Sequence, residues 1–194
     1  DPETEEAMQR GLRRLIGAAT VLGPGLHLLS DVLEWRHGGF SPGQLWMNYL
    51  GFLLIPFLMV GLYAVQRPRA GWGVLAGALL YGAAFIYFSF TTLYALSEHI
   101  ADYAALWRKL GTLYTAHGGL MIVGGLLFAV ASLRAGVLPR GAVLGFLVGV
   151  LLNLLFGLLP VPELWQTIGS TVRNVGLIGM GVALLTGEAR PAAA

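Results

Sequence analysis

The stretch that decides the fold is residues 137–159, which read VLPRGAVLGFLVGVLLNLLFGLL. Arg140 is its only charged residue, and the rest is almost entirely apolar. A helix rises about 1.5 Å per residue, so about 20 apolar residues cross a bilayer core of about 30 Å. Residues 137–159 therefore predict a transmembrane helix.

Five other stretches have the same length and character. They cover residues 12–33, 45–65, 72–96, 113–133 and 164–185. Short connections rich in proline, glycine and arginine separate most of them, which is typical of breaks between helices. The sequence thus predicts an all-α integral membrane bundle of about six transmembrane helices, forming a single transmembrane domain over residues 1–194. In the longer connection 98–111, apolar residues alternate with charge, which predicts a short amphipathic helix at the membrane interface.

The composition excludes an ordinary soluble domain. Of the 194 residues, 56% are hydrophobic and 11% are charged, whereas soluble domains have about 25% charged residues. A soluble chain of this length could not bury so much apolar surface. The absence of cysteine excludes disulfides, iron–sulfur clusters, thiolate metal sites and a cysteine nucleophile. The net charge of +2 comes from basic residues in short loops, so nucleic acid is not an expected partner.

The basic residues also predict an orientation. One side of the predicted bundle carries Arg10, Arg13, Arg14, Arg67, Arg69, Arg134, Arg140 and Arg190. The other side carries Arg36, Arg108 and Lys109, together with Trp35, Trp46, Trp107 and Trp165. Cytoplasmic loops are enriched in Lys and Arg, and tryptophan collects at membrane interfaces. We therefore expect a multi-pass protein of a cell inner membrane with its N- and C-termini in the cytoplasm.

Small residues form a stripe along the segment 137–159. Gly141, Gly145, Gly149 and Gly157 recur at intervals of four or eight, which lets helices approach closely in lipid. Asn153 completes the stripe, so it should face a neighbouring helix rather than lipid.

Three polar residues share one face of the segment 12–33. His27, Asp31 and Glu34 are spaced by four and three positions. An imidazole and a carboxylate one turn apart can hold a metal, or the carboxylate can orient the imidazole. A hydrogen bond that only locks helix packing is the alternative. Asp31 and Glu34 are also the candidates for a catalytic acid or base.

Further polar residues lie inside other predicted spans. His117 is expected at a depth similar to that of His27, and Arg173 and Asn174 lie near the middle of the last span. An arginine there is costly and needs a partner. The candidate partners are Asp31, Asn153 and a bound anionic group, such as a heme propionate, a lipid phosphate or a substrate carboxylate.

Most intramembrane polar residues fall in the predicted outer half, while the inner half reads as inert glycine-rich packing. The outer-half set is His27, Asp31, His117, Asn153, Arg173 and Asn174. Such a set predicts a polar cavity that binds a small ligand or cofactor. The expected ligand-binding residues are His27, His117, Asn153, Arg173 and Asn174, and a metal would be held by His27, Asp31 and His117. The cofactor itself is left open between a b-type heme and a divalent metal.

Residues 113–122, which read LYTAHGGLMI, resemble the second helix of subunit I of the heme–copper oxidases. In that family the matching histidine is an axial ligand of the low-spin heme. The resemblance implies His117 as a b-type heme ligand, with His27 as its partner. The rest of the chain departs from the family, because it has no His-Pro-Glu-Val-Tyr run, no adjacent histidine pair for copper and too few helices. An oxidase core is therefore excluded.

Residues 124–144, with the turn RAGVLPR between two glycine-rich segments, are similar to a large class of small bacterial polytopic inner-membrane proteins. This resemblance extends over most of the chain and implies a fold and a location, but no activity.

Three other functions stay open beside ligand binding. The protein is a membrane-embedded enzyme acting on a lipid or isoprenoid-like substrate, with Asp31, Glu34 or His27 as acid or base. Or it is a transporter that uses Arg173 and Asp31. Or it is an accessory subunit in which the polar residues only set helix register. The expected partners are the lipid bilayer and either other membrane subunits or further copies of the chain.

Overall fold

The chain folds into six helices. The structure, a computed structural model, describes residues 1–189, so the predicted position of Arg190 lies outside the described residues. The helices are α1 (Pro2–His37), α2 (Pro42–Ala64), α3 (Trp72–Ser97), α4 (Tyr103–Ala135), α5 (Arg140–Leu158) and α6 (Glu163–Thr186). All six are long and apolar enough to cross a membrane. Within the described part of the chain every regular element is a helix, which confirms the predicted all-α bundle of six candidate spans.

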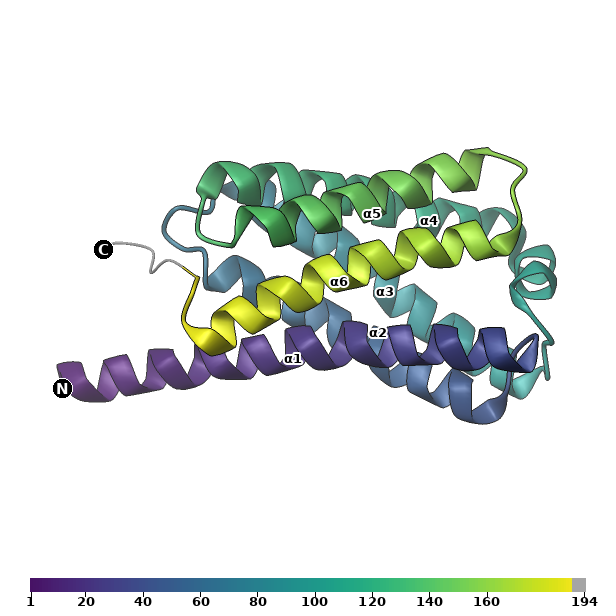
Figure 1. Cartoon of the computed structure of the whole chain (residues 1–194), viewed down its shortest axis with the longest axis horizontal. Helices are drawn as coiled ribbons and strands as arrows, with labels where there is room; N and C mark the ends of the chain where they lie inside the picture. The colour runs from purple at the N-terminus through teal and green to yellow at the C-terminus, as the bar shows by residue number, and fades with distance from the viewer. Residues whose placement is uncertain (190–194) are drawn as a thin grey trace.

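The six helices close into a ring. Each helix packs against the next one in the chain, and α6 also packs against α1. Figure 1 shows α1 beginning and α6 ending at the same end of the bundle, which we call the near end; the opposite end is the distal end. Helices that are not neighbours in this ring make no backbone contacts with one another. This order decides which side chains can meet.

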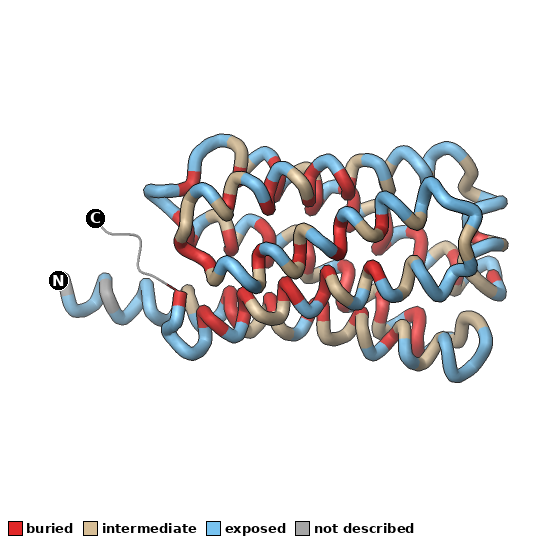
Figure 2. Tube along the Cα trace, turned by 45° about the horizontal axis from the view of Figure 1, so that its top comes forward, coloured by how far each residue is buried: buried red, intermediate tan, exposed pale blue. Residues whose placement is uncertain are grey.

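The helix α1 is longer than its apolar stretch. It begins at Pro2 rather than at residue 12, and its first turns extend beyond the bundle as an exposed segment (Figure 2). The side chain of Asp1 accepts a hydrogen bond from the backbone N–H of Glu3, and Glu3 and Glu5 lie in the first turn. Acidic residues there favour the positive end of the helix dipole. At the other end, Gly38 adopts the left-handed conformation that commonly terminates helices.

The predicted amphipathic helix within 98–111 is present as the first turns of α4. Asp102 caps it by accepting a hydrogen bond from the backbone N–H of Ala105 at 2.7 Å. The chain then bends at Gly111, whose φ of 54° and ψ of −131° interrupt the helix. Figure 1 shows these turns set apart from the rest of α4 at the distal end. The bend needs glycine, because a side chain is strained at such a positive φ.

Glycines set the distance between the helices. A Cβ built on Gly23 of α1 would lie 3.3 Å from the carbonyl oxygen of Gly51 on α2. A Cβ on Gly17 of α1 would lie 3.0 Å from the carbonyl oxygen of Gly181 on α6. In the stripe predicted on α5, Gly149 makes a close contact of this kind, with the backbone of Arg173 on α6. Gly141 differs from the prediction, because the space around it is open.

The inside of the ring is filled by aromatic side chains. Tyr81, Phe85, Phe128 and Phe146 are almost completely buried there. Large apolar side chains also cover the outside of the bundle, as at Phe57, which is 71% exposed. Exposed apolar surface on this scale is expected of a helix bundle that lipid surrounds.

Candidate functional site

Arg173 of α6 is buried in the centre of the bundle. It is 3% exposed, and its Nη1 donates to Oδ1 of Asn153 on α5 at 2.9 Å and to the sulfur of Met121 on α4 at 3.1 Å. Its Cζ lies 5.6 Å from the ring centroid of Phe85 on α3. Its Nε has no hydrogen-bond partner. The guanidinium is therefore surrounded by neutral groups from three helices.

Of the partners predicted for Arg173 within the chain, Asn153 is confirmed and Asp31 is not in contact. The nearest ion pairs that the structure records at this end join His27 to Asp31 and Lys109 to Glu98, and neither includes Arg173. Asp31 forms its ion pair with His27 on α1, while Nη1 of Arg173 is bonded to side chains of α4 and α5.

Asn153 faces α6, as the glycine stripe predicted. Its Nδ2 donates to the backbone oxygen of Gln166 at 3.1 Å and lies within 3.5 Å of Oγ of Ser170. These contacts direct its Oδ1 toward Arg173. One turn away, a Cβ on Gly149 would collide with the backbone nitrogen and Cα of Arg173. The glycine thus brings α6 close enough to α5 for the two polar side chains to meet.

His27 joins α1 to α6. The Nδ2 of Asn174 lies 3.0 Å from Nδ1 of His27, and an amide nitrogen can only donate. With the amide in this orientation, Nδ1 is the acceptor and Nε2 carries the imidazole hydrogen. Nε2 lies 3.6 Å from Oδ1 of Asp31, one turn further along α1. The ring of Phe52 on α2 packs edge-on against the imidazole at 4.7 Å.

His117 does not join this group. Its Nδ1 lies 2.8 Å from the backbone oxygen of Leu113, and its ring stacks on Tyr87 of α3 at 3.8 Å. Since α4 contacts α3 and α5 but not α1, His117 and His27 lie on helices that are not neighbours. The paired-histidine heme site implied by the oxidase resemblance is therefore not formed, and the residues present do not fit it.

The predicted metal site is not assembled either. Among the described residues, no group of three or more His, Asp or Glu side chains is placed to hold a metal ion. His27 and Asp31 are together on α1, but His117, the third expected ligand, is held elsewhere by Tyr87. The prediction failed because similar depth in the membrane does not bring two side chains together unless their helices are neighbours.

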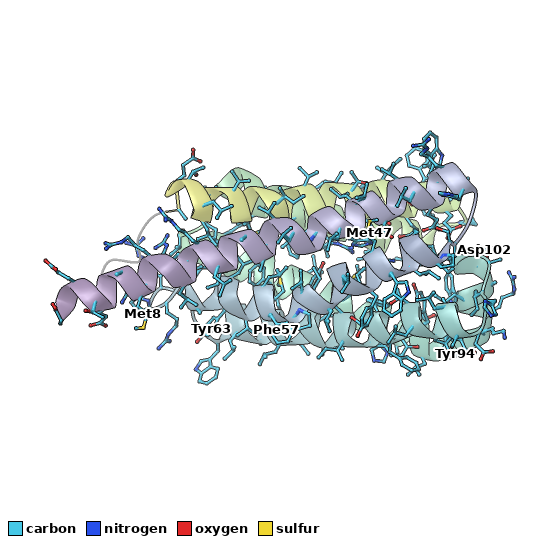
Figure 3. The ribbon with its side chains drawn as sticks, turned by 90° about the horizontal axis from the view of Figure 1, so that it is seen from below. Met8, Met47, Phe57, Tyr63, Tyr94 and Asp102 are labelled. Carbon is cyan, nitrogen blue, oxygen red and sulfur yellow. The ribbon has the colours of Figure 1, made fainter. Side chains whose placement is uncertain are left out.

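Several buried polar residues at the distal end were missed. Gln44 and Asn48 of α2 are completely buried. Nε2 of Gln44 donates to Oγ of Ser30 at 2.9 Å and to Oε2 of Glu34 at 3.4 Å, while Nδ2 of Asn48 donates to the hydroxyl of Tyr103 at 3.2 Å. Figure 3 labels Met47, which lies between these two residues on α2, and Asp102 at this end. The spacing of four between Gln44 and Asn48 was a readable sign of a shared polar face.

The inner half is less inert than predicted. Near the other end of the bundle, Gln66 is completely buried. Its Nε2 donates to the backbone oxygen of Leu62 at 3.0 Å and to Oγ of Ser132 at 3.2 Å. This contact ties the turn after α2 to α4. It is still small beside the polar network of the distal half.

Asp31 and Glu34, the candidates for a catalytic acid or base, keep that role as a prediction. Both lie on the face of α1 that carries His27, and Glu34 is bonded to α2 through Gln44. Comparisons of the chain with protein-family models, curated proteins and solved structures give no match.

Proposed function

We propose that this protein binds a small anionic ligand, bearing a carboxylate or a phosphate, in the distal half of its helix bundle. Arg173 is the anchor. The observation that carries the proposal is that this buried guanidinium contacts only neutral groups and keeps an Nε without an acceptor.

The energetic argument rests on charge. An arginine near the centre of a membrane-spanning helix costs about 2.5–3.5 kcal/mol on insertion scales. Asn153 and Met121 supply acceptors for one nitrogen but no negative charge, and Asp31, the buried carboxylate within electrostatic range, makes no hydrogen bond to the guanidinium. A carboxylate or phosphate would supply both, since guanidinium binds such groups with charge-assisted and often bidentate hydrogen bonds.

We further infer that the distal end faces outward, with both termini in the cytoplasm of an inner membrane. The near end carries most of the arginines, as the positive-inside rule requires. Trp35, Trp46, Trp107 and Trp165 begin or end helices at the distal end and are 45% exposed or more. Such side chains suit the interface between lipid and water.

Binding of the proposed anion can be tested by measuring the thermal unfolding temperature of the purified protein in maltoside detergent. Sodium acetate and sodium phosphate would each be titrated against sodium chloride at equal ionic strength. We expect the midpoint to rise with acetate or phosphate concentration, because ligand binding to the folded state stabilises it. Addition of phosphatidylglycerol without free phosphate forms a separate arm. A shift in that arm alone would identify a lipid headgroup as the anion.

Variants connect the shift to Arg173. Arg173→Lys keeps the charge but loses the planar donor pair, so most of the anion response should disappear. Arg134→Lys, an exposed arginine near the end of α4, is the matched control and should keep the full response. An anion response that is absent from the wild type, or equal in Arg173→Lys, would contradict the proposal.

A further inference from the structure

Three buried oxygen atoms at the distal end have no hydrogen-bond donor. They are Oδ2 of Asp31, Oε1 of Gln44 and Oδ1 of Asn48. Gln44 and Asn48 are completely buried, and the side chain of Asp31 is 9% exposed. We call these three residues the acceptor cluster. A buried acceptor without a partner costs about 1–3 kcal/mol, so three together require an explanation.

The free oxygen of Gln44 follows from its neighbours. Oγ of Ser30 donates its one hydrogen to the backbone oxygen of Gln44 at 3.3 Å, so toward the side chain it must accept. Nε2 of Gln44 therefore points to Ser30 at 2.9 Å and also reaches Oε2 of Glu34 at 3.4 Å. In this orientation of the amide, Oε1 is an acceptor without a donor.

The acceptor cluster is one place in the fold. Asp31 and Glu34 lie three residues apart on α1, and Gln44 is bonded to Glu34. Asn48 follows Gln44 by one turn of α2 and donates to the hydroxyl of Tyr103. Three residues beyond Asn48, Gly51 of α2 packs against α1, where a Cβ would lie 3.2 Å from the backbone nitrogen of His27. The groups of α1 and α2 therefore face the same small region under the start of α4.

The charge around the acceptor cluster is negative. Asp102 and Glu163, at the same end of the bundle, lie within electrostatic range of Glu34, as does Asp31. Arg173 is the nearby cation, but its Nη1 is bonded to Asn153 and Met121. Carboxylate and amide oxygens are the ligands that hard cations prefer, and soft or nitrogen-binding metals do not suit them.

We propose that Asp31, Gln44 and Asn48, with Glu34, form a binding site for a hard cation. Ca²⁺ accepts mixed carboxylate and amide ligands in flexible geometry, whereas Mg²⁺ demands near-ideal octahedral geometry and retains its waters. The negative charge of Asp102 and Glu163 would concentrate cations at this end. The site uses atoms other than those that hold Arg173, so it does not depend on the proposed anion.

The test starts from purified full-length protein in maltoside, stripped with a chelator. CaCl₂ and NaCl would be titrated during thermal unfolding, with choline chloride at equal ionic strength as the reference. We expect a saturable rise in the midpoint, and about one bound calcium per chain by elemental analysis after gel filtration. If only sodium raises the unfolding temperature, and the rise levels off as the NaCl concentration increases, the same site binds a monovalent cation. No rise with either cation and no bound calcium would overturn the proposal and leave water as the occupant.

Matched variants make the test specific. Asp31→Asn keeps the shape and removes the charge, so the apparent affinity for the cation should fall at least tenfold. Gln44→Met should also lose the response. Gln66→Met is the control, since Gln66 is an equally buried glutamine with an unpartnered Oε1 near the other end. It should keep the full cation response, and an equal loss there would contradict the proposal.

Arg173→Lys separates this site from the proposed function. It should keep the cation response while losing the response to acetate or phosphate. If acetate raises the unfolding temperature of the wild type but no cation does, the proposed cation site is wrong and the proposed anion site is supported. If a cation raises the unfolding temperature but acetate and phosphate do not, only the proposed cation site is supported.

Discussion

Asn174 hydrogen-bonds to His27 across the seam where the last helix meets the first. The two side chains are 147 positions apart in the chain, and their nitrogen atoms lie 3.0 Å apart. The bond is a polar contact between the first and last helices of the ring, in addition to the one between Arg13 and the backbone oxygen of Ala189. It also assigns the imidazole hydrogen to Nε2, which faces Asp31.

Removing the Asn174 amide should destabilise the bundle. Asn174→Ala leaves the buried Nδ1 of His27 without a donor, which costs about 1–3 kcal/mol. Val175→Ala, at a neighbouring position that is 57% exposed, is the control and should have a smaller effect. The measurement is the free energy of unfolding in mixed detergent micelles. Equal stability of Asn174→Ala and the wild type would show that the contact is not formed.

Asn153→Asp should abolish the response to added anions. It places a carboxylate where Oδ1 now lies 2.9 Å from Nη1 of Arg173, and so supplies a negative charge to the guanidinium from within the chain. The response of the unfolding temperature to acetate or phosphate should therefore disappear. The unfolding temperature itself is not the readout, because the substitution also removes the Nδ2 donor to the backbone oxygen of Gln166. An intact anion response in Asn153→Asp would contradict Arg173 as the anchor.

Two glycines of α5 should respond differently to the same substitution. Gly149→Ala would push α6 away, because the new Cβ collides with the backbone of Arg173. Overpacking of this kind typically costs about 1–3 kcal/mol. Gly145→Ala has more room, since the nearest atom to its Cβ would be Cα of Gly176 at 3.6 Å. Unfolding measurements should therefore find Gly149→Ala less stable than Gly145→Ala, and a reversed order would contradict the α5–α6 contact.

Cysteine labelling tests the orientation without background, because the chain contains no cysteine. Ala101→Cys places an exposed thiol in the distal turn before α4, and Glu188→Cys places one after α6 at the near end. A membrane-impermeant maleimide added to intact cells should label the first and not the second. After the cells are opened, both should react. Labelling of Glu188→Cys alone in intact cells would reverse the orientation.

The six helices could be predicted from the sequence because the lipid bilayer imposes a simple requirement on any segment that spans it. A spanning segment must be apolar for about 20 residues and must satisfy its backbone hydrogen bonds internally. Residues 137–159 and the five similar stretches meet this requirement, and each corresponds to one helix of the structure. The differences occur where lipid is not the constraint. The exposed start of α1 precedes the apolar stretch, and the bend in α4 lies at the backbone of Gly111.

Within a helix, periodicity also placed side chains correctly. The shared face of His27 and Asp31 and the inward position of Asn153 are confirmed. These relationships follow from 3.6 residues per turn and need no knowledge of neighbouring helices.

The sequence pattern could not predict which helices are neighbours. Depth in the membrane suggested His27 and His117 as partners, but α1 closes against α6 and α2, and α4 does not reach it. His27 therefore meets Asn174, while Gln44 and Asn48 approach the α1 carboxylates. Apolar faces in lipid specify neighbours weakly, since lipid tails are as apolar as leucine; close contacts at small residues such as Gly149 and Gly181 select them. The site is made by those contacts, which join residues that lie far apart along the chain.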